Sequence, residues 1–179
     1  MLSDCHKRIQ YFLRSLVVLA EQALDGPLSE PLNKDQRIRL ETALHYFREG
    51  GPRHTADEEE SLFPRLRSID TPAIREAFAK IEELEADHKR AEAKHREVDT
   101  IGRRWLADGH ITNKEATQLS ALLAGLSRLY DRHLVIEESE IFAIARAVLP
   151  EFEKEALGQE MARRRGILLR SVNAEPYRA

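Results

Sequence analysis

An internal repeat places histidine and glutamate at matched positions in the two halves of the chain. Segments 54–63 and 133–142 both read as His, three residues, Glu-Glu, two residues, an aliphatic residue and Phe. A second match, His6-Lys-Arg against His88-Lys-Arg, relates the two halves at nearly the same offset along the chain. Self-similarity on this scale is typical of a duplicated structural unit. The repeat therefore predicts two related helical hairpins.

Helix start and stop signals divide the chain into the elements that these hairpins require. Asn33 and Thr112 are suitable N-caps, Pro72 follows Thr71 at a first helical position, and Gly109 is a suitable stop. Gly50-Gly51-Pro52 is expected to kink or locally unwind the second helix. The expected helices span about 4–25, 33–67, 72–108, 112–149 and 150–165.

Strand-like alternation is absent from the sequence, so we predict an all-α fold. Short connections between long helices favour an up-and-down antiparallel four-helix bundle with an additional C-terminal helix. We expect residues 1–149 to form the bundle and residues 150–179 to form a helix and tail packed on or beside it. Arg163-Arg164-Arg165 would then close the last helix, where cations favour the negative end of the helix dipole.

Composition excludes several classes of partner. The chain has 179 residues, of which 42% are hydrophobic, which suits one domain with a sizeable core. A net charge of −3, with both signs mixed, favours neither nucleic acid nor an anionic membrane. The apolar stretch 13–20 is interrupted by Arg14 and is too short to span a bilayer, and the single Cys5 fits a reducing compartment. We expect a cytoplasmic protein, with Ile167-Leu168-Leu169 packed in a groove or in a homodimer contact.

Reflection of positions across the turns brings four histidines to one level. Antiparallel helices place residues equally distant from a turn at the same height. With turn centres near residues 29, 70 and 110, each histidine reflects to within two residues of the next one along the chain. Because a helical residue rises about 1.5 Å, the errors amount to a few ångströms. The four are His6, His54, His88 and His133.

Direction adds two carboxylates to this layer. Glu58 and Glu137 each follow a histidine by four residues, so each shares that histidine's helix face. Glu59 and Glu138 follow by five residues and point away, either into solvent or behind the ligands. A bridging role for Glu59 or Glu138 would require a distorted helix. Cys5 is rotated about 100° from His6 and is expected to be a packed or surface residue.

The chemistry of this set indicates a metal site. Neutral imidazoles and carboxylates suit iron, manganese or zinc, and carboxylates offset the charge of two nearby cations. The alternative is that each histidine is structural and that each His-x-x-x-Glu pair lies on a helix surface. However, four level imidazoles with two facing carboxylates would be costly to bury without a cation. Their recurrence on a repeat favours the metal site.

The motifs resemble those of the hemerythrin-like (HHE) cation-binding family. The likeness lies in Asp4-Cys5-His6, in residues 54–64 and in His133-x-x-x-Glu137-Glu138, and it covers roughly residues 3–149. The resemblance implies a four-helix bundle around two iron ions, bridged by oxo or hydroxo, that react with dioxygen, nitric oxide or peroxide. Zinc or manganese are possible substitutes. The resemblance implies the metal ligands His6, His54, Glu58, His88, His133 and Glu137.

One departure separates this chain from the oxygen-carrying members of that family. Those proteins use a fifth histidine four residues from the third-helix ligand, whereas Leu84 and Glu92 stand four residues from His88 here. Simple reversible oxygen carriage is therefore not expected. Glu92 is an alternative ligand, although a charged residue on this helix is more often a solvated ion-pair partner.

The remaining polar candidates have ordinary interpretations. His45 and His95 are expected at the surface or behind the ligands, and His110 is expected in a loop. Tyr130 faces the core side, where it either packs or donates a hydrogen bond to a bound oxygen species. Two functional classes follow: a small-molecule enzyme or scavenger, and a sensing module in which iron occupancy changes a partner surface. A metal reservoir is a weaker third alternative.

Overall fold

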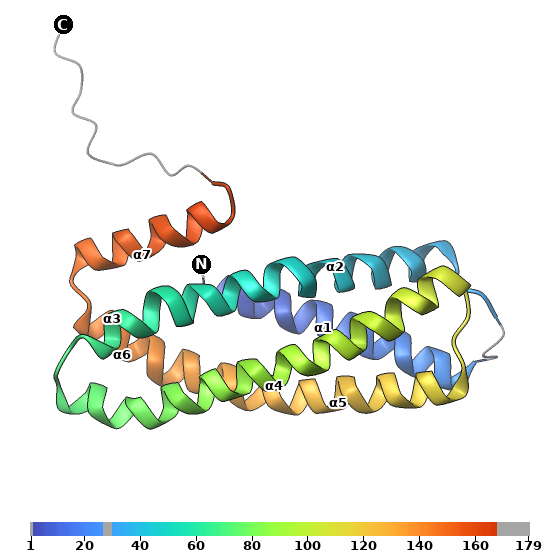
Figure 1. Ribbon diagram of the computed structural model, residues 1–179, viewed down its shortest axis with the longest axis horizontal. Coiled ribbons are helices and arrows are strands. Elements are labelled where there is room, and N and C mark those ends of the chain that lie inside the picture. The colour runs from blue at the N-terminus through green and yellow to red at the C-terminus, as the bar shows by residue number, and fades with distance from the viewer. Residues whose placement is uncertain (1, 27–29, 168–179) are drawn as a thin grey trace, which may run out of the picture.

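The structure, a computed structural model, describes residues 2–26 and 30–167 and is an elongated bundle of helices (Figure 1). No strand occurs among the described residues, so the predicted all-α fold is confirmed. The described residues form four helical rods, which span residues 2–25, 34–67, 72–108 and 113–148. Each rod contacts the rods next to it in sequence, and the first also contacts the fourth. The elements are α1 Leu2–Asp25, α2 Lys34–Ala56, η1 Asp57–Leu62, α3 Phe63–Arg67, α4 Pro72–Asp108, α5 Asn113–Ile136, η2 Glu137–Ile141, α6 Phe142–Val148 and α7 Glu151–Arg164.

The helix ends follow the predicted capping signals. Asn33 and Thr112 each form a capping box, in which the side chain accepts a hydrogen bond from a backbone N–H three residues on. Thr71 caps α4, and Pro72 occupies its first turn. Gly109 ends α4 with φ at 77°, a left-handed conformation that favours glycine.

The second rod departs from the prediction in one respect. Helix α2 continues through Pro52 to Ala56, so the expected unwinding at Gly50-Gly51-Pro52 is wrong. Local propensity is a weak prior where a helix buries an apolar face, and here Phe47 is buried before Pro52 and His54 after it. The departure from α-helical geometry occurs a few residues later.

Two wide turns of π-helix occupy equivalent positions in the two halves. In η1 the N–H of Phe63 donates to the carbonyl of Glu58, and in η2 the N–H of Phe142 donates to the carbonyl of Glu137. Each bond spans five residues instead of four, which defines the π-helix. The residues of the sequence repeat therefore coincide with a repeated backbone distortion.

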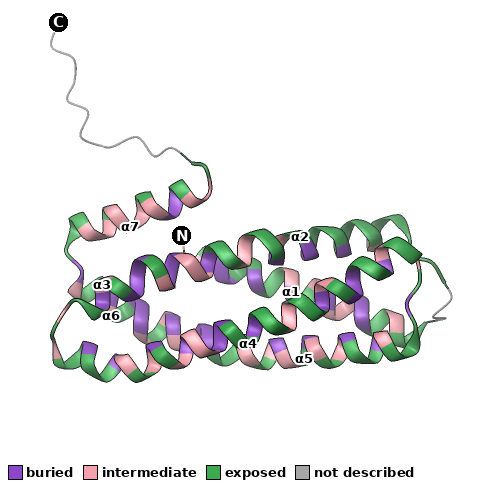
Figure 2. Ribbon diagram, in the orientation of Figure 1, coloured by how far each residue is buried: buried purple, intermediate pink, exposed green. Residues whose placement is uncertain are grey.

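The buried surface forms two apolar clusters separated along the bundle. One draws on α1, α2, α4 and α5, and the other draws on η1, α3, α6 and the first half of α4. On α4, His88 lies between Leu84 of one cluster and Ala91 of the other. Figure 2 shows buried residues along the facing sides of the rods. A layer of buried polar residues thus lies between two apolar clusters, each of which packs without it.

Helix α7 is fastened to the second rod by ion pairs. Arg65 of α3 contacts Glu153 at 2.7 Å and Glu160 at 2.8 Å. Arg164, the last residue of α7, contacts the fully buried Asp57 at 3.1 Å, and Arg165, which follows the helix, contacts it at 2.6 Å. The helix dipole therefore does not suffice to explain these two arginines.

Two further expectations meet the limits of the described chain. Ile167 is exposed, whereas Leu168 and Leu169 lie outside the described residues. Among the described residues, no helix combines the length and the apolar character that a membrane span requires.

Candidate metal centre

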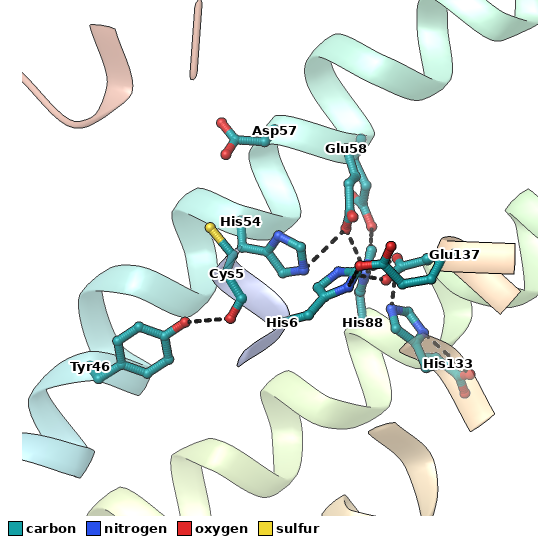
Figure 3. A network of polar contacts seen from close by, with 12 residues as sticks. Cys5, His6, Tyr46, His54, Asp57, Glu58, His88, His133 and Glu137 are labelled. Carbon is teal, nitrogen blue, oxygen red and sulfur yellow. Dashed lines mark hydrogen bonds and ion pairs between the residues drawn. The ribbon is translucent and has the colours of Figure 1, made fainter. Parts of the chain in front are cut away.

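The structure brings all six predicted ligands together inside the bundle (Figure 3). One group consists of His6 and His54 with both glutamates, and the other consists of His88 and His133 with the same two glutamates. Within each group one nitrogen or oxygen from every residue lies within 4.8 Å of the others. The shared residues are Glu58 and Glu137. All six are buried, and the most accessible of them, His88, is 9% exposed.

The facing atoms approach one another without forming hydrogen bonds. Glu137 lies 3.1 Å from His6 Nε2 through one oxygen and 2.9 Å from His133 Nε2 through the other. Nε2 of His88 lies 3.4 Å from Glu58. Within the described chain, no hydrogen-bond partner is present for Nε2 of His6 or of His88. The same holds for all four carboxylate oxygens of Glu58 and Glu137.

Such spacing fits atoms directed at a common point. Two ligands at right angles around an ion, each about 2.1 Å from it, lie about 3 Å apart. Unpartnered buried polar groups are costly, by about 1–3 kcal/mol each for neutral groups. An imidazole and carboxylate donor set suits first-row transition metals. The residues present therefore fit a metal centre.

The outer nitrogens of two imidazoles are held by carboxylates from the opposite half of the repeat. His6 Nδ1 donates to Glu138 of η2 at 2.8 Å, and His88 Nδ1 donates to Glu59 of η1 at 2.8 Å. Each bond fixes the tautomer in which Nε2 carries the lone pair. Of the two predicted places for Glu59 and Glu138, the structure shows the one behind the predicted ligands, where each carboxylate contacts an imidazole.

The other two imidazoles differ from each other. His133 Nδ1 lies 3.6 Å from Asp87, a buried carboxylate that Arg132 contacts at 2.8 Å. Within residues 2–26 and 30–167 no carboxylate contacts His54 Nδ1 in this way, and neither Nδ1 atom has a hydrogen-bond partner. The second match of the sequence repeat explains this, because Cys5 precedes His6 where Asp87 precedes His88. The two halves of the centre are therefore chemically unequal.

Burial sets the protonation of the centre. Burial lowers the pKa of His54 to about 3 and also lowers the pKa of His88, so both imidazoles stay neutral and retain a lone pair. Burial and the neighbouring Glu137 raise the pKa of Glu58 well above its usual value. For Glu137 burial acts in the same direction, but the contacts from His133 and His6 outweigh it and lower the pKa. A cation in the site would favour the ionised form of Glu58.

The other predicted candidates lie outside the ligand groups. Glu92 is exposed and pairs with Arg96 at 3.6 Å, as expected for a solvated partner. His45 is exposed, and His110 is an exposed residue of the turn before α5. Cys5 is buried, with its thiol 3.5 Å from an Arg165 nitrogen, which fits the expected packed residue.

His95 and Tyr130 form a pair that the sequence did not predict. His95 Nε2 and the Tyr130 hydroxyl share a hydrogen bond of 3.0 Å, and His95 stacks on Phe47 with ring centroids 4.2 Å apart. The Tyr130 ring also meets His133 edge to face, with centroids 6.3 Å apart. Tyr130 therefore packs beside the predicted ligand His133, and its hydroxyl is engaged by His95.

We expect His95 to make the fold acid-sensitive. Burial lowers its pKa from 6.5 to about 4, so between these values the unfolded chain binds the extra proton and stability falls as pH falls. His95→Phe should remove this term, which amounts to roughly 2–3 kcal/mol. Denaturant unfolding of both proteins at equal metal content, at pH 7 and pH 4.5, measures it. Equal pH dependence in both proteins would contradict the assignment.

The sequence did not identify two supporting groups, Asp87 and Asp57, or the imidazoles that Glu59 and Glu138 contact. Asp87 had a signal, because it precedes His88 as Cys5 precedes His6. Asp57 has partners more than 100 residues away, at the end of α7 and just after it, and no local pattern identifies them. The crosswise placement of Glu59 and Glu138 depends on the wide turns, which the sequence did not predict.

Comparison with known proteins agrees with this geometry. The model of one protein family, described as the hemerythrin HHE cation binding domain, matches residues 1–145. That match includes all six residues of the two ligand groups. A search of curated proteins found no match.

Proposed function

This chain belongs to the hemerythrin HHE cation-binding family, and from that premise we propose that it is a non-haem di-iron protein that reacts with dioxygen, nitric oxide or peroxide. The observation that carries the proposal is the sharing of Glu58 and Glu137 between two histidine pairs. Two shared carboxylates and four imidazoles supply each of two ions with four protein ligands. Positions remain for a small molecule, because iron, manganese and octahedral zinc accept more than four.

Iron is the preferred occupant because the proposed chemistry needs electrons. Zinc fits the same ligands but carries no redox chemistry, whereas a reduced iron pair gives up electrons to a small oxidant. The residues of the chain have supporting roles. Glu59 and Glu138 hold the imidazoles of His88 and His6 in the metal-binding tautomer. The apolar clusters cover the centre on its two sides along the bundle axis.

Two residues stand where an oxygen-carrying hemerythrin could have its fifth histidine, and both favour a reaction with the bound small molecule over reversible carriage of oxygen. Leu84 is fully buried in the apolar cluster, and Glu92 is held at the surface by Arg96. Neither side chain adds a ligand. The centre thus has fewer protein ligands than an oxygen-carrying hemerythrin, which leaves more room for a reactant to bind.

A sensing role is the second candidate, and α7 favours it. Asp57, adjacent to the shared Glu58, carries the ion pairs to Arg164 and Arg165. A change in occupancy that moves η1 would therefore act on the docking of α7. Steady turnover with an electron donor favours the enzyme, whereas stoichiometric binding with altered protease sensitivity of α7 favours the sensor.

Metal content and absorption test the proposal. Protein loaded anaerobically with ferrous iron should hold about two ions per chain, and admission of air should produce the charge-transfer bands of a bridged diferric pair. Zinc and manganese loading provide the comparison. Failure of all three metals to bind in stoichiometric amounts would show that the buried layer is structural.

A further inference from the structure

A cavity of about 290 Å³ lies beside the centre, bounded mainly by α2 and α4. Exposed residues, including Pro52, Lys89 and Glu92, stand at its mouth. Its inner end is lined by the imidazoles of His54, His88 and His133. A larger hollow of about 510 Å³ lies between α4 and α5, but none of the six predicted ligands lines it. The smaller cavity is therefore the one that leads to the centre.

The cavity is larger than the small oxidants require. A water molecule takes about 30 Å³ in the liquid, so this space corresponds to roughly ten waters. Dioxygen, nitric oxide and hydrogen peroxide each occupy about the volume of one or two waters on that scale. A cavity of this size lies at the lower end of the range for pockets that hold organic ligands.

The lining favours a neutral molecule with an apolar body. Ile9, Phe47 and Ala91 are buried and present apolar surface to the cavity. Three of the four charged residues at the mouth are engaged elsewhere, since Glu59 binds His88, Glu60 binds Arg164 and Glu92 binds Arg96. The fourth, Lys89, is exposed at the rim. The polar groups deeper in are His95 and Tyr130, whose hydrogen-bonded pair offers one site for a hydroxyl.

We propose that this cavity holds the organic part of a hydroperoxide, so that the substrate of the centre is an organic hydroperoxide in preference to hydrogen peroxide. The inference rests on the proposed function, and it joins the peroxide chemistry of the centre to an apolar space of organic size. In the reaction the O–O bond breaks and the reduced metal pair is oxidised by one electron per ion. Two protons from solvent complete the products, which are an alcohol and water.

Gly51 offers a way to fill the cavity. It lines the cavity within α2, and a Cβ at this position meets nothing within 4 Å outside its chain neighbours. Gly51→Phe is therefore expected to add a ring beside the cavity, because its Cβ meets no packed atom. Because a Cβ before Pro52 disfavours the helical conformation, thermal unfolding and metal content serve as checks on folding. Gly158→Phe is the matched control, since Gly158 of α7 also faces open space and lies outside the cavity.

The binding experiment uses 2-phenyl-2-propanol, the alcohol formed from cumene hydroperoxide. Zinc-loaded protein excludes redox chemistry, and ligand-observed NMR measures occupancy. We expect saturable binding to the wild type and to Gly158→Phe, weakened at least tenfold in Gly51→Phe. Tyr130→Phe, which keeps the ring and removes the hydroxyl, should weaken binding several-fold. The inference would be overturned if the wild type showed no saturable binding. It would also be overturned if Gly51→Phe and Tyr130→Phe both bound the alcohol with the affinity of the wild type.

A rate comparison tests the substrate. Reduced, iron-loaded protein is mixed with cumene hydroperoxide or hydrogen peroxide, and oxidation is followed by absorption in a single turnover. The ratio of the two rates should favour the organic peroxide at least tenfold, fall at least tenfold in Gly51→Phe and stay unchanged in Gly158→Phe. A ratio that is insensitive to Gly51→Phe would refute the preference. If neither peroxide oxidises iron that air does oxidise, the inference is overturned while the proposed di-iron function stands. If air also fails to oxidise the iron, the proposed function fails as well.

Discussion

His54→Ala should lose at least half of the bound metal while the protein keeps its helical content. His54 belongs to only one of the two ligand groups, so the ion shared with His6 is lost first. His133→Ala should act in the same way on the other ion. Helical content is kept because the apolar clusters on both sides of the layer pack without it. Metal analysis of the purified variants, with far-ultraviolet circular dichroism, measures both effects.

The matched control for His54→Ala is His45→Ala. His45 lies on the same helix α2 but is exposed and belongs to neither ligand group. Its replacement should leave metal content unchanged. Full metal content in both His54→Ala and His133→Ala would show that the ligand assignment is wrong. Glu58→Gln adds a sharper test, because it should retain some iron but lose the spectrum of a carboxylate-bridged pair, and an unchanged spectrum would place the bridge elsewhere.

Removing the two arginines that meet Asp57 should destabilise the protein by about 3 kcal/mol or more. Asp57 is completely buried, and its carboxylate is contacted by Arg164 at 3.1 Å and by Arg165 at 2.6 Å. The double variant Arg164→Met, Arg165→Met leaves that charge buried and unpaired while keeping long side chains. Denaturant unfolding measures the loss, and limited proteolysis should detect release of α7.

Two variants separate the lost ion pair from a general effect on α7. Arg163→Met changes an exposed neighbour and should alter stability little. Adding Asp57→Asn to the double variant removes the buried charge and should restore part of the stability. If the double variant is as stable as Arg163→Met, the pairing with Asp57 contributes nothing and the other contacts of α7, including those with Arg65, hold the helix.

The sequence was sufficient for the fold and for the six buried residues because both depend on simple periodicities. Counting residues from each turn gives height, and a spacing of four gives direction, so His54 with Glu58 and His133 with Glu137 were identifiable. Both rules hold for any straight antiparallel bundle. They need no knowledge of side-chain packing.

The contacts that support the six buried residues could not be predicted from these two rules, because they depend on backbone distortion and on distant partners. Glu59 follows His54 by five residues, and its contact with His88 depends on a turn that is not α-helical. Asp57 has one arginine partner at a separation of 107 residues and another at 108, and charges on α7 offered many alternative pairings. The local unwinding expected at Gly50-Gly51-Pro52 does not occur, because tertiary packing outweighs local propensity there.

The two π-helical turns limit where this chain tolerates changes in length. Deleting one residue from either turn would leave the Glu58–Phe63 or Glu137–Phe142 hydrogen bond spanning four residues, the α-helical value, so the phenylalanine would keep its place. The wide turn would be lost, and with it the placement of Glu59 or Glu138 that depends on it. The repeat is consistent with this limit. His54 and Phe63 keep the same separation as His133 and Phe142, whereas the segment from His6 to His54 is longer than that from His88 to His133. Insertions and deletions are thus expected in the connections between helices, and not between each ligand pair and the phenylalanine that follows it.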